Sequence, residues 1–207
     1  MNAFDQPGIL IATIIGGYIL GSIPFGLVLT RLAGLGDIRQ IGSGNIGATN
    51  VLRTGNKPLA FFTLVLDGGK GGIAVLAVLL FDIDPVFSLI AGACAVIGHN
   101  FPIWLKFKGG KGVATTIGTV LAAAWPVGIA ICITWLVVAM ASRISSLAAI
   151  VALGISPVYA WYLVEAPNNQ ALAIMTGFLG FLAIVRHRAN IGRILRGEEP
   201  RIGAKKD

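Results

Sequence analysis

The stretch from Val113 to Ser142, VATTIGTVLAAAWPVGIAICITWLVVAMAS, decides how often this chain crosses a membrane. As one helix, its roughly 30 residues would extend about 45 Å, whereas two full crossings of a bilayer core need about 60 Å. Pro126 lies near its middle, and proline ends or kinks a helix. We therefore expect a hairpin of short or partial helices that turns near Trp125 and Pro126.

The composition excludes an ordinary soluble domain. Of the 207 residues, 56% are hydrophobic and 12% are charged, whereas soluble domains average about 25% charged residues. A globule of this size has too little interior for so much apolar side chain, so lipid must solvate much of it. Residues 1–7 contain Asp5 but no Lys or Arg. Because a cleaved signal peptide normally begins with a basic region, we expect the first apolar run to stay as a span.

Five further apolar runs approach or exceed the length of about 20 residues that crosses a bilayer as a helix. They are Ile9–Leu29, Pro58–Phe81, Pro85–Leu105, Ile144–Val164 and Ala171–Val185. The second run contains Asp67-Gly68-Gly69-Lys70-Gly71-Gly72, which we expect to interrupt its helix. The prediction is an all-α polytopic transmembrane helix bundle of about seven helices, five full spans plus the short-helix hairpin. It forms one domain over residues 1–207.

The sixteen Lys and Arg residues cluster in alternate gaps between the apolar runs. Basic gaps lie on the cytoplasmic side of a membrane. The basic gaps are 34–57, 106–112 and the tail from Arg186, whereas 82–84 is acidic and 165–170 has no base. This pattern predicts an external N-terminus and an internal C-terminus. It also requires an even number of passes through residues 113–142, which is why we expect a hairpin there.

The first polar motif is Ser43-Gly44-Asn45-Ile46-Gly47-Ala48-Thr49-Asn50-Val51-Leu52-Arg53. Small and amide residues leave donors free to face an anion, and the Arg53 guanidinium adds a charged fork. The motif therefore indicates an anion site in the first internal loop. The alternative is a solvated turn whose arginine only anchors the chain at the membrane surface.

The second polar motif is Lys106-Phe107-Lys108-Gly109-Gly110-Lys111-Gly112. Glycines that open a helix present bare amides to an anion, and the helix N-terminus adds partial positive charge. A nucleotide-binding P-loop would carry Ser or Thr after its lysine to hold magnesium, but here Gly112 follows Lys111. The motif favours a phosphate site without nucleotide or metal, and the alternative is a flexible basic loop.

Two further clusters lie inside apolar runs. Asp67 and Lys70 are three residues apart and could neutralise each other across one helical turn. The pair either lines a polar cavity, with Lys70 as a second phosphate contact, or holds the interrupted segment together. His99, before the lysine-rich loop, is better explained as structural support than as a catalytic group. Cys94 and Cys132 have no metal-binding spacing, so we expect buried thiols rather than a disulfide or metal site.

The last motif begins Arg186-His187-Arg188-Ala189-Asn190, where the final span ends. His187 and Asn190 would share one helix face, and a histidine here could accept a proton or donate to phosphate. The alternative is a basic cluster attracted to anionic lipid. The following Glu198 and Glu199 are expected to cap or pair locally.

Taken in order, these motifs closely resemble the PlsY family of acyl-phosphate:glycerol-3-phosphate acyltransferases. The resemblance rests on three ordered motifs and covers essentially the whole chain. It implies transfer of an acyl group from acyl phosphate to the 1-position of glycerol-3-phosphate in the bacterial cytoplasmic (inner) membrane. It also implies that neither acyl-CoA nor acyl carrier protein is the direct donor. Thioester-dependent acyltransferases commonly carry His-x4-Asp, and this chain has Trp104 and Gly192 five residues after its two histidines.

The resemblance also implies the roles of individual residues. The phosphate of glycerol-3-phosphate would be held by Ser43, Arg53, Lys111 and His187. Asn190 and Asn45 would orient its hydroxyls. The remaining substrate-binding positions would be Gly44, Asn50, Lys70, Lys106, Gly109, Gly110 and Gly112. The proton of the attacking hydroxyl would go to a substrate phosphate or to His187, and an acyl-enzyme on Ser43 is less favoured.

The expected partners are acyl phosphate, glycerol-3-phosphate and membrane lipid, with no nucleic acid, cofactor or metal. The chain is expected to act as a monomer that could associate with other lipid-synthesis enzymes. Two rival functions use similar chemistry. An organophosphate transporter would share the basic cavity, but no inverted repeat is apparent. A CDP-alcohol phosphotransferase needs an aspartate cluster for metal, and no aspartate series follows Asp67.

Overall fold

The computed structural model describes residues 6–81 and 83–203, and every regular element among them is helical. The chain divides into two compact units, Met1–Ala123 and Ala124–Asp207, called unit 1 and unit 2 below. The expectations for residues 1–5, for Asp82 in the acidic gap and for Lys205 and Lys206 fall outside the described residues.

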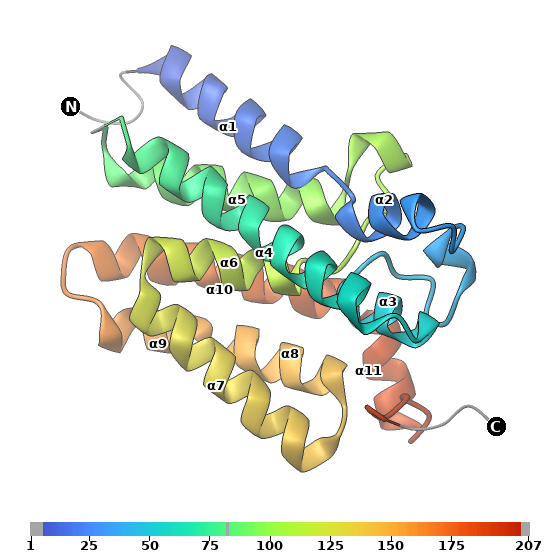
Figure 1. Ribbon diagram of the computed structural model, residues 1–207. Coiled ribbons are helices and arrows are strands. Elements are labelled where there is room, and N and C mark those ends of the chain that lie inside the picture. The colour runs from blue at the N-terminus through green and yellow to red at the C-terminus, as the bar shows by residue number, and fades with distance from the viewer. Residues whose placement is uncertain (1–5, 82, 204–207) are drawn as a thin grey trace. The chain divides into compact units, whose positions relative to one another are not determined.

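Unit 1 is built from six α-helices and three short 3-10 turns among the residues described. The helices are α1 (Pro7–Gly21), α2 (Phe25–Leu32), α3 (Ala48–Val51), α4 (Lys57–Leu79), α5 (Pro85–Asn100) and α6 (Val113–Ala123). The turns are η2 (Ile38–Gln40), η3 (Leu52–Thr54) and η4 (Ile103–Leu105). Helix α4 packs against α5 and α6, and α1 lies along α5 (Figure 1).

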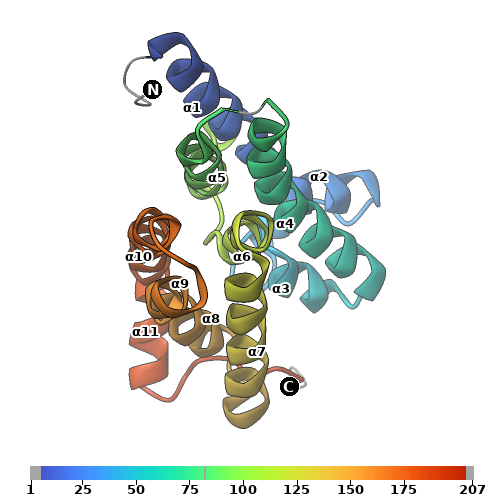
Figure 2. The same cartoon turned by 90° about the vertical axis from the view of Figure 1, so that its left-hand side faces the viewer.

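Unit 2 contains the remaining helices of the described chain. They are α7 (Trp125–Ser142), α8 (Ser145–Gly154), α9 (Ser156–Leu163), α10 (Asn168–Arg186) and α11 (Arg188–Leu195). Helix α10 packs against α8 and α9, and α7 packs against α8 (Figure 2). A hydrogen bond of 2.7 Å between the hydroxyls of Thr134 and Tyr159 joins α7 to α9.

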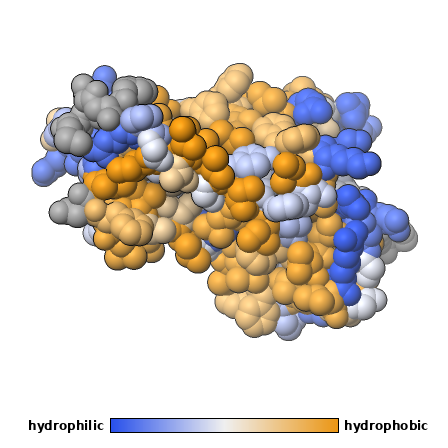
Figure 3. Space-filling view, turned by 90° about the horizontal axis from the view of Figure 1, so that it is seen from above, coloured by the Kyte–Doolittle hydropathy of each residue, from blue (hydrophilic) through white to orange (hydrophobic). Residues whose placement is uncertain are grey.

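Five helical segments are long and apolar enough to cross a membrane. They are Pro7–Leu32, Lys57–Leu79, Pro85–Leu105, Trp125–Ser142 and Asn168–Arg186. Large apolar side chains on them are exposed, for example Phe61 and Phe62 on α4, and the face in Figure 3 is largely hydrophobic. An exposed apolar surface of this extent requires lipid around it, so the predicted all-α transmembrane bundle is confirmed.

The break expected at Trp125 and Pro126 is confirmed, because α6 ends at Ala123 and α7 begins at Trp125. The two helices differ in length, however: α6 has 11 residues and α7 has 18, enough for a span of its own. The run Ile144–Val164 is instead divided into α8 and α9, which are bent by 40°. Pro157 lies at the start of α9, and its ring and missing N–H explain the interruption.

The interruption expected at residues 67–72 was wrong, since α4 runs unbroken from Lys57 to Leu79. In a bilayer a helix must satisfy its own backbone hydrogen bonds, and this requirement outweighs the low helix propensity of glycine. Small residues also let helices approach closely. A Cβ atom on Gly118 of α6 would lie only 2.0 Å from the carbonyl oxygen of Gly68. Gly68, Gly71 and Gly72 of α4 therefore form a contact surface for α6 rather than a break.

Glu199 ties the C-terminal segment to unit 2. Its carboxylate accepts hydrogen bonds from the Ser146 hydroxyl at 2.7 Å, the Arg193 guanidinium at 2.7 Å and the Asn190 amide. Burial raises the pKa of the Glu199 carboxyl, but these hydrogen bonds outweigh burial and hold it below its usual 4.5. Glu198 pairs with Arg196 at 2.7 Å. The predicted local pairing of both glutamates is confirmed.

Replacing Gly71 with alanine should destabilise unit 1, because the added Cβ would lie 2.4 Å from the carbonyl oxygen of Thr115. We expect a loss of about 1–3 kcal/mol, as for other overpacked positions. Gly69→Ala is the matched control in the same helix. No atom lies within 4 Å of that added Cβ, so its effect should be neutral or stabilising by up to about 1 kcal/mol. Thermal unfolding of both variants in detergent checks this, and equal Tm values would contradict the close packing of α4 on α6.

The stabilising effect of Glu199 should fade at acidic pH. A carboxyl whose pKa is lowered by folding stabilises the fold above its unfolded pKa, and this contribution is lost as pH falls. The Tm advantage of the wild type over Glu199→Gln should therefore shrink as pH falls below 4.5. Glu198→Gln is the control, because an exposed ion pair contributes little. A Tm advantage over Glu199→Gln that persists unchanged at acidic pH would refute this role.

Candidate functional site

The amide of Asn50 holds the first polar loop of unit 1 together. Its Nδ2 atom lies 2.7–3.0 Å from the carbonyl oxygens of Ile38, Ile41 and Asn45. Its Oδ1 atom accepts from the Ser43 backbone N–H at 2.9 Å and from the Ser43 hydroxyl at 3.2 Å. The side chain is buried. Asn50 thus fixes the loop conformation from within, and its predicted contact with substrate stays a prediction.

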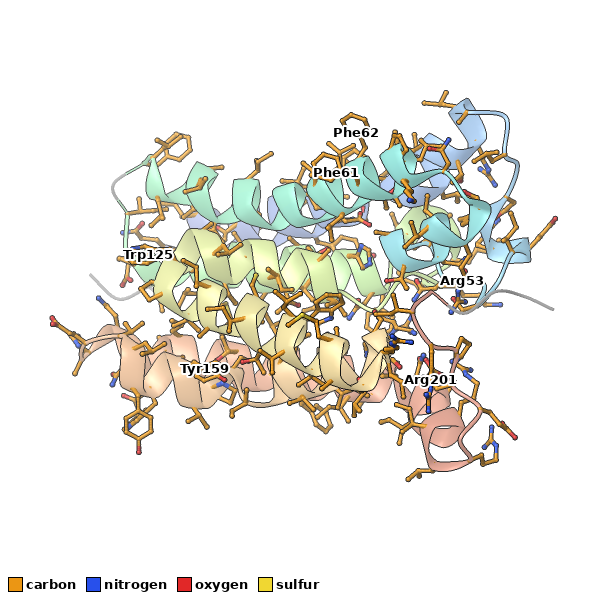
Figure 4. The ribbon with its side chains drawn as sticks, turned by 60° about the horizontal axis from the view of Figure 1, so that its bottom comes forward. Arg53, Phe61, Phe62, Trp125, Tyr159 and Arg201 are labelled. Carbon is orange, nitrogen blue, oxygen red and sulfur yellow. The ribbon has the colours of Figure 1, made fainter. Side chains whose placement is uncertain are left out.

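Arg53 lies over Gly42, the residue that precedes Ser43. A Cβ atom on Gly42 would lie 2.8 Å from Cδ and 3.2 Å from Nη1 of Arg53, so the arginine side chain lies directly over this residue. Gly42 also has a φ of +58°, a conformation that favours glycine. Ser43 and Arg53 are both exposed, and Arg53 is labelled in Figure 4. No acceptor among residues 6–81 and 83–203 contacts the Arg53 guanidinium, which leaves its charge available to an anion.

The loop at residues 106–112, called the glycine-rich loop below, is bound to the end of α5. The backbone N–H of Gly109 donates to the carbonyl oxygen of Asn100 at 3.2 Å, and that of Gly110 donates to His99 at 3.0 Å. Gly109 has no room for a side chain, because its Cβ would lie 2.2 Å from the His99 carbonyl oxygen. Helix α6 begins immediately afterwards at Val113. The predicted arrangement of glycines at the start of a helix is confirmed.

Both loops lie at the same end of unit 1. The first loop packs around a core formed by Leu27, Ile38, Ile46, Val51 and Ala60, and Leu105 of η4 packs against this core. The adjacent Trp104 indole donates to the Ser22 hydroxyl at 3.0 Å, at the end of α1. An arginine and several lysines therefore gather at one end of an apolar unit, which favours binding of a small anion.

Asp67, Lys70 and His99 form a buried cluster in unit 1. The Lys70 ammonium lies 2.8 Å from Oδ1 of Asp67 and 2.9 Å from Nδ1 of His99. The predicted Asp67–Lys70 pair is confirmed. The Lys70 side chain is only 1% exposed, and its predicted contact with phosphate stays a prediction.

The site residues of unit 2 lie where α10 meets α11. His187 ends α10, and its Nδ1 atom lies 2.7 Å from the carbonyl oxygen of Ala183. Asn190 lies in the first turn of α11, and its amide donates to Glu199. Both side chains are buried. The short spacing therefore places an imidazole and an amide together at one helix junction.

Two supporting residues were not identified from the sequence as part of this site. Glu199 holds the amide of Asn190, but a spacing of nine residues outside regular structure gives no signal of contact. Asn100 lies under the glycine-rich loop, since a Cβ atom on Gly112 would be 2.8 Å from its Oδ1 atom. Asn100 follows His99 directly in the sequence, but hydrophobic periodicity does not show that it lies under the loop.

Comparison with known proteins shows the family to which the chain belongs. A family model described as glycerol-3-phosphate acyltransferase matches residues 11–197. A glycerol-3-phosphate acyltransferase of Paramagnetospirillum magneticum is 64% identical over 198 residues, covering 95% of this chain and 96% of the relative. One from Rhodospirillum rubrum is 61% identical over 199 residues, covering 93% and 90%.

Two solved structures have the same fold. A crystal structure of PlsY, an integral membrane glycerol 3-phosphate acyltransferase, in its glycerol 3-phosphate form superposes with a TM-score of 0.86 at 39% identity, over 94% of this chain and 96% of that chain. The lysophosphatidic acid form gives a TM-score of 0.84 at 38% identity, over 94% and 95%. The resemblance found in the motifs is confirmed across nearly the whole length. The chain belongs to the PlsY family of integral membrane glycerol-3-phosphate acyltransferases.

Proposed function

We propose that this chain transfers an acyl group from acyl phosphate to the 1-hydroxyl of glycerol-3-phosphate. The products are lysophosphatidic acid and inorganic phosphate, in the first acylation step of bacterial phospholipid synthesis. Residues 1–207 act as one acyltransferase domain, as a monomer in the inner membrane. The observation that carries the proposal is that Arg53 lies over Gly42, the neighbour of Ser43, at the same end of unit 1 as the glycine-rich loop.

The phosphate of glycerol-3-phosphate is the first anion that this end of the molecule would hold. The Arg53 guanidinium, which lies over Gly42, supplies a charged fork. The next residue along the chain, Ser43, supplies a hydroxyl. The family resemblance assigns Lys111 of the glycine-rich loop and His187 as further phosphate contacts. Asn45 and Asn190 orient the hydroxyls. Charge-assisted hydrogen bonds of this kind are about twice as strong as neutral ones.

The second anion is the phosphate of the acyl donor, which the loop shaped by Gly109, Gly110 and Gly112 would admit beside the charge of Lys106. Its acyl chain stays in lipid against the exposed apolar surface. Holding two reactants side by side removes much of the entropic barrier to their reaction. Repulsion between the two phosphates is offset by the cations of the site.

The reaction balances without a cofactor. The 1-hydroxyl oxygen attacks the acyl carbonyl carbon, the bond from that carbon to the bridging phosphate oxygen breaks, and phosphate leaves with the bonding electrons. The hydroxyl proton goes to a substrate phosphate or to His187. The Ala183 carbonyl oxygen can only accept a hydrogen bond, so Nδ1 of a neutral His187 carries its hydrogen. Nε2 then donates to a phosphate when the ring is protonated and carries the lone pair of a base when the ring is neutral.

The choice of acyl phosphate as donor rests on the family resemblance and on the motifs. A thioester-dependent acyltransferase would use His-x4-Asp, and Trp104 and Gly192 replace that aspartate here. The basic gaps support an active site on the cytoplasmic face, with the N-terminus outside and the C-terminus inside. That face is where a water-soluble polyol phosphate is available.

Purified protein should convert palmitoyl phosphate and glycerol-3-phosphate into lysophosphatidic acid and phosphate in equal amounts. Palmitoyl-CoA should give no product under the same conditions, because its leaving group is not a phosphate. Mass spectrometry of the lipid and a phosphate assay measure both products. Product from the CoA ester but not from the phosphate would refute the proposed donor. Accumulation of glycerol-3-phosphate in vesicles without lipid product would instead support a transporter.

Arg53→Ala and Lys111→Ala should each lower kcat/KM by about 100-fold or more, because each removes a charge-assisted contact worth about 1.5–3 kcal/mol and leaves anion repulsion unscreened. Lys57→Ala and Lys108→Ala are the matched controls, since both are exposed basic residues on neighbouring positions. The controls should retain most activity. Wild-type rates in Arg53→Ala and Lys111→Ala would remove the phosphate-site assignment.

A further inference from the structure

The ammonium of Lys70 is held by three acceptors from three segments of unit 1. Its Nζ atom lies 2.7 Å from the carbonyl oxygen of Ile23, 2.8 Å from Oδ1 of Asp67 and 2.9 Å from Nδ1 of His99. It also lies 5.6 Å from the ring centroid of Phe25, at the start of α2. An ammonium has three N–H bonds, so these three acceptors use its full donor capacity.

This arrangement fixes the orientation of the His99 ring. An ammonium can only donate, so Nδ1 of His99 must accept and the hydrogen of the neutral ring lies on Nε2. The Nε2 edge of the ring faces the glycine-rich loop. A Cβ atom on Gly110 would lie only 2.0 Å from Nε2. The ring therefore forms the surface on which the Gly110 backbone rests.

The main chain of the same segment holds the loop from below. The carbonyl oxygens of His99 and Asn100 accept from the backbone N–H groups of Gly110 and Gly109. Any rotation of the His99 ring would press on Gly110, and any shift of the end of α5 would break both backbone bonds. The position of the loop thus depends on the groups that hold His99, and the Lys70 ammonium, 2.9 Å from Nδ1, is one of them.

We propose that Lys70, paired with Asp67, is a positioning residue that holds the glycine-rich loop in its anion-binding conformation through His99. The effect on catalysis rests on the proposed function of the loop. The contact between Lys70 and the loop through His99 does not depend on that function. Lys70 acts without touching substrate, because its three N–H bonds are engaged inside unit 1. This differs from the phosphate contact that the sequence predicted for it.

Stability alone does not account for a charged pair at this depth. Replacing a buried ion pair with apolar residues of similar volume is often neutral or stabilising, whereas removing one partner is strongly destabilising. An apolar pair could fill the same space between α4 and α5, but it could not orient an imidazole. The charged pair supplies a hydrogen-bond donor at Nδ1 of His99, which an apolar pair lacks.

The experiment compares Lys70→Met with the double variant Asp67→Leu/Lys70→Met. The single variant should lose thermal stability, because Asp67 is left as an unpaired buried charge. The double variant should recover most of that stability but keep a KM for palmitoyl phosphate raised about tenfold or more, since misplaced binding groups cost one to two orders of magnitude. Hydrogen exchange at the Gly109 and Gly110 amides should be about tenfold faster than in the wild type.

A second pair of variants tests the link at His99 and does not depend on folding of the first pair. His99→Asn keeps an acceptor close to the place of Nδ1, whereas His99→Leu removes it. His99→Asn should restore KM and amide exchange to within about threefold of the wild type. His99→Leu should resemble the double variant in both measurements.

Three results would overturn the proposal. Recovery of stability, KM and exchange together in the double variant would make the pair purely structural. A raised KM with unchanged exchange would mean that Lys70 contacts the phosphate directly. Equal behaviour of His99→Asn and His99→Leu would place the link elsewhere. The proposed function can fail separately. If the wild type has no acyltransferase activity but the double variant still shows faster amide exchange, the link through His99 stands and the proposed function is refuted.

Discussion

The core of a bilayer offers no partner for a buried charge, and the arrangement of unit 1 follows from how it neutralises the Lys70 ammonium. The charge lies in the middle of a long apolar helix and is matched by Asp67 one turn earlier. The two remaining N–H bonds reach the break between α1 and α2 and the end of α5. One ammonium thereby joins three segments that are far apart in the sequence.

In unit 1 the closely packed helix contacts and the hydrogen-bonded polar loops lie in different places. Where α4 meets α6, glycines bring the two backbones together, and hydrogen bonds within each helix satisfy the peptide groups. At the end that carries Ser43 and Arg53, the chain leaves regular helix, and side-chain amides such as Asn50 replace the missing backbone partners. The anion site that we propose lies at that end, where irregular backbone and basic side chains occur together.

The long spans could be predicted from the sequence because the length of an apolar run is a direct physical measure of bilayer thickness. The break at Pro126 was also predictable, since proline acts locally. The continuity of α4 through Asp67–Gly72 was not, because it depends on α6 approaching the glycines and on partners for Lys70 far away in sequence. The division of Ile144–Val164 depends on packing in unit 2 as well as on Pro157.

The site shows the same contrast between local and distant information. The motifs around Ser43, Lys111 and His187 could be recognised because their residue types are unusual for plain loops. The supporting contacts could not, since Asn50 bonds to carbonyl groups across the loop and Glu199 reaches back to Ser146 and Asn190. Side chains that we propose to contact substrate can be recognised from unusual residue types in a loop. Side chains that contact the rest of the protein can be identified only from the fold.

The most direct measurement is a crystal structure of this chain with glycerol-3-phosphate bound. The account predicts the phosphate within hydrogen-bond distance of the Ser43 hydroxyl and the Arg53 guanidinium, with the Lys70 ammonium still bound to His99 and not to the ligand. A phosphate bound away from both loops, or one in direct contact with Lys70, would contradict it.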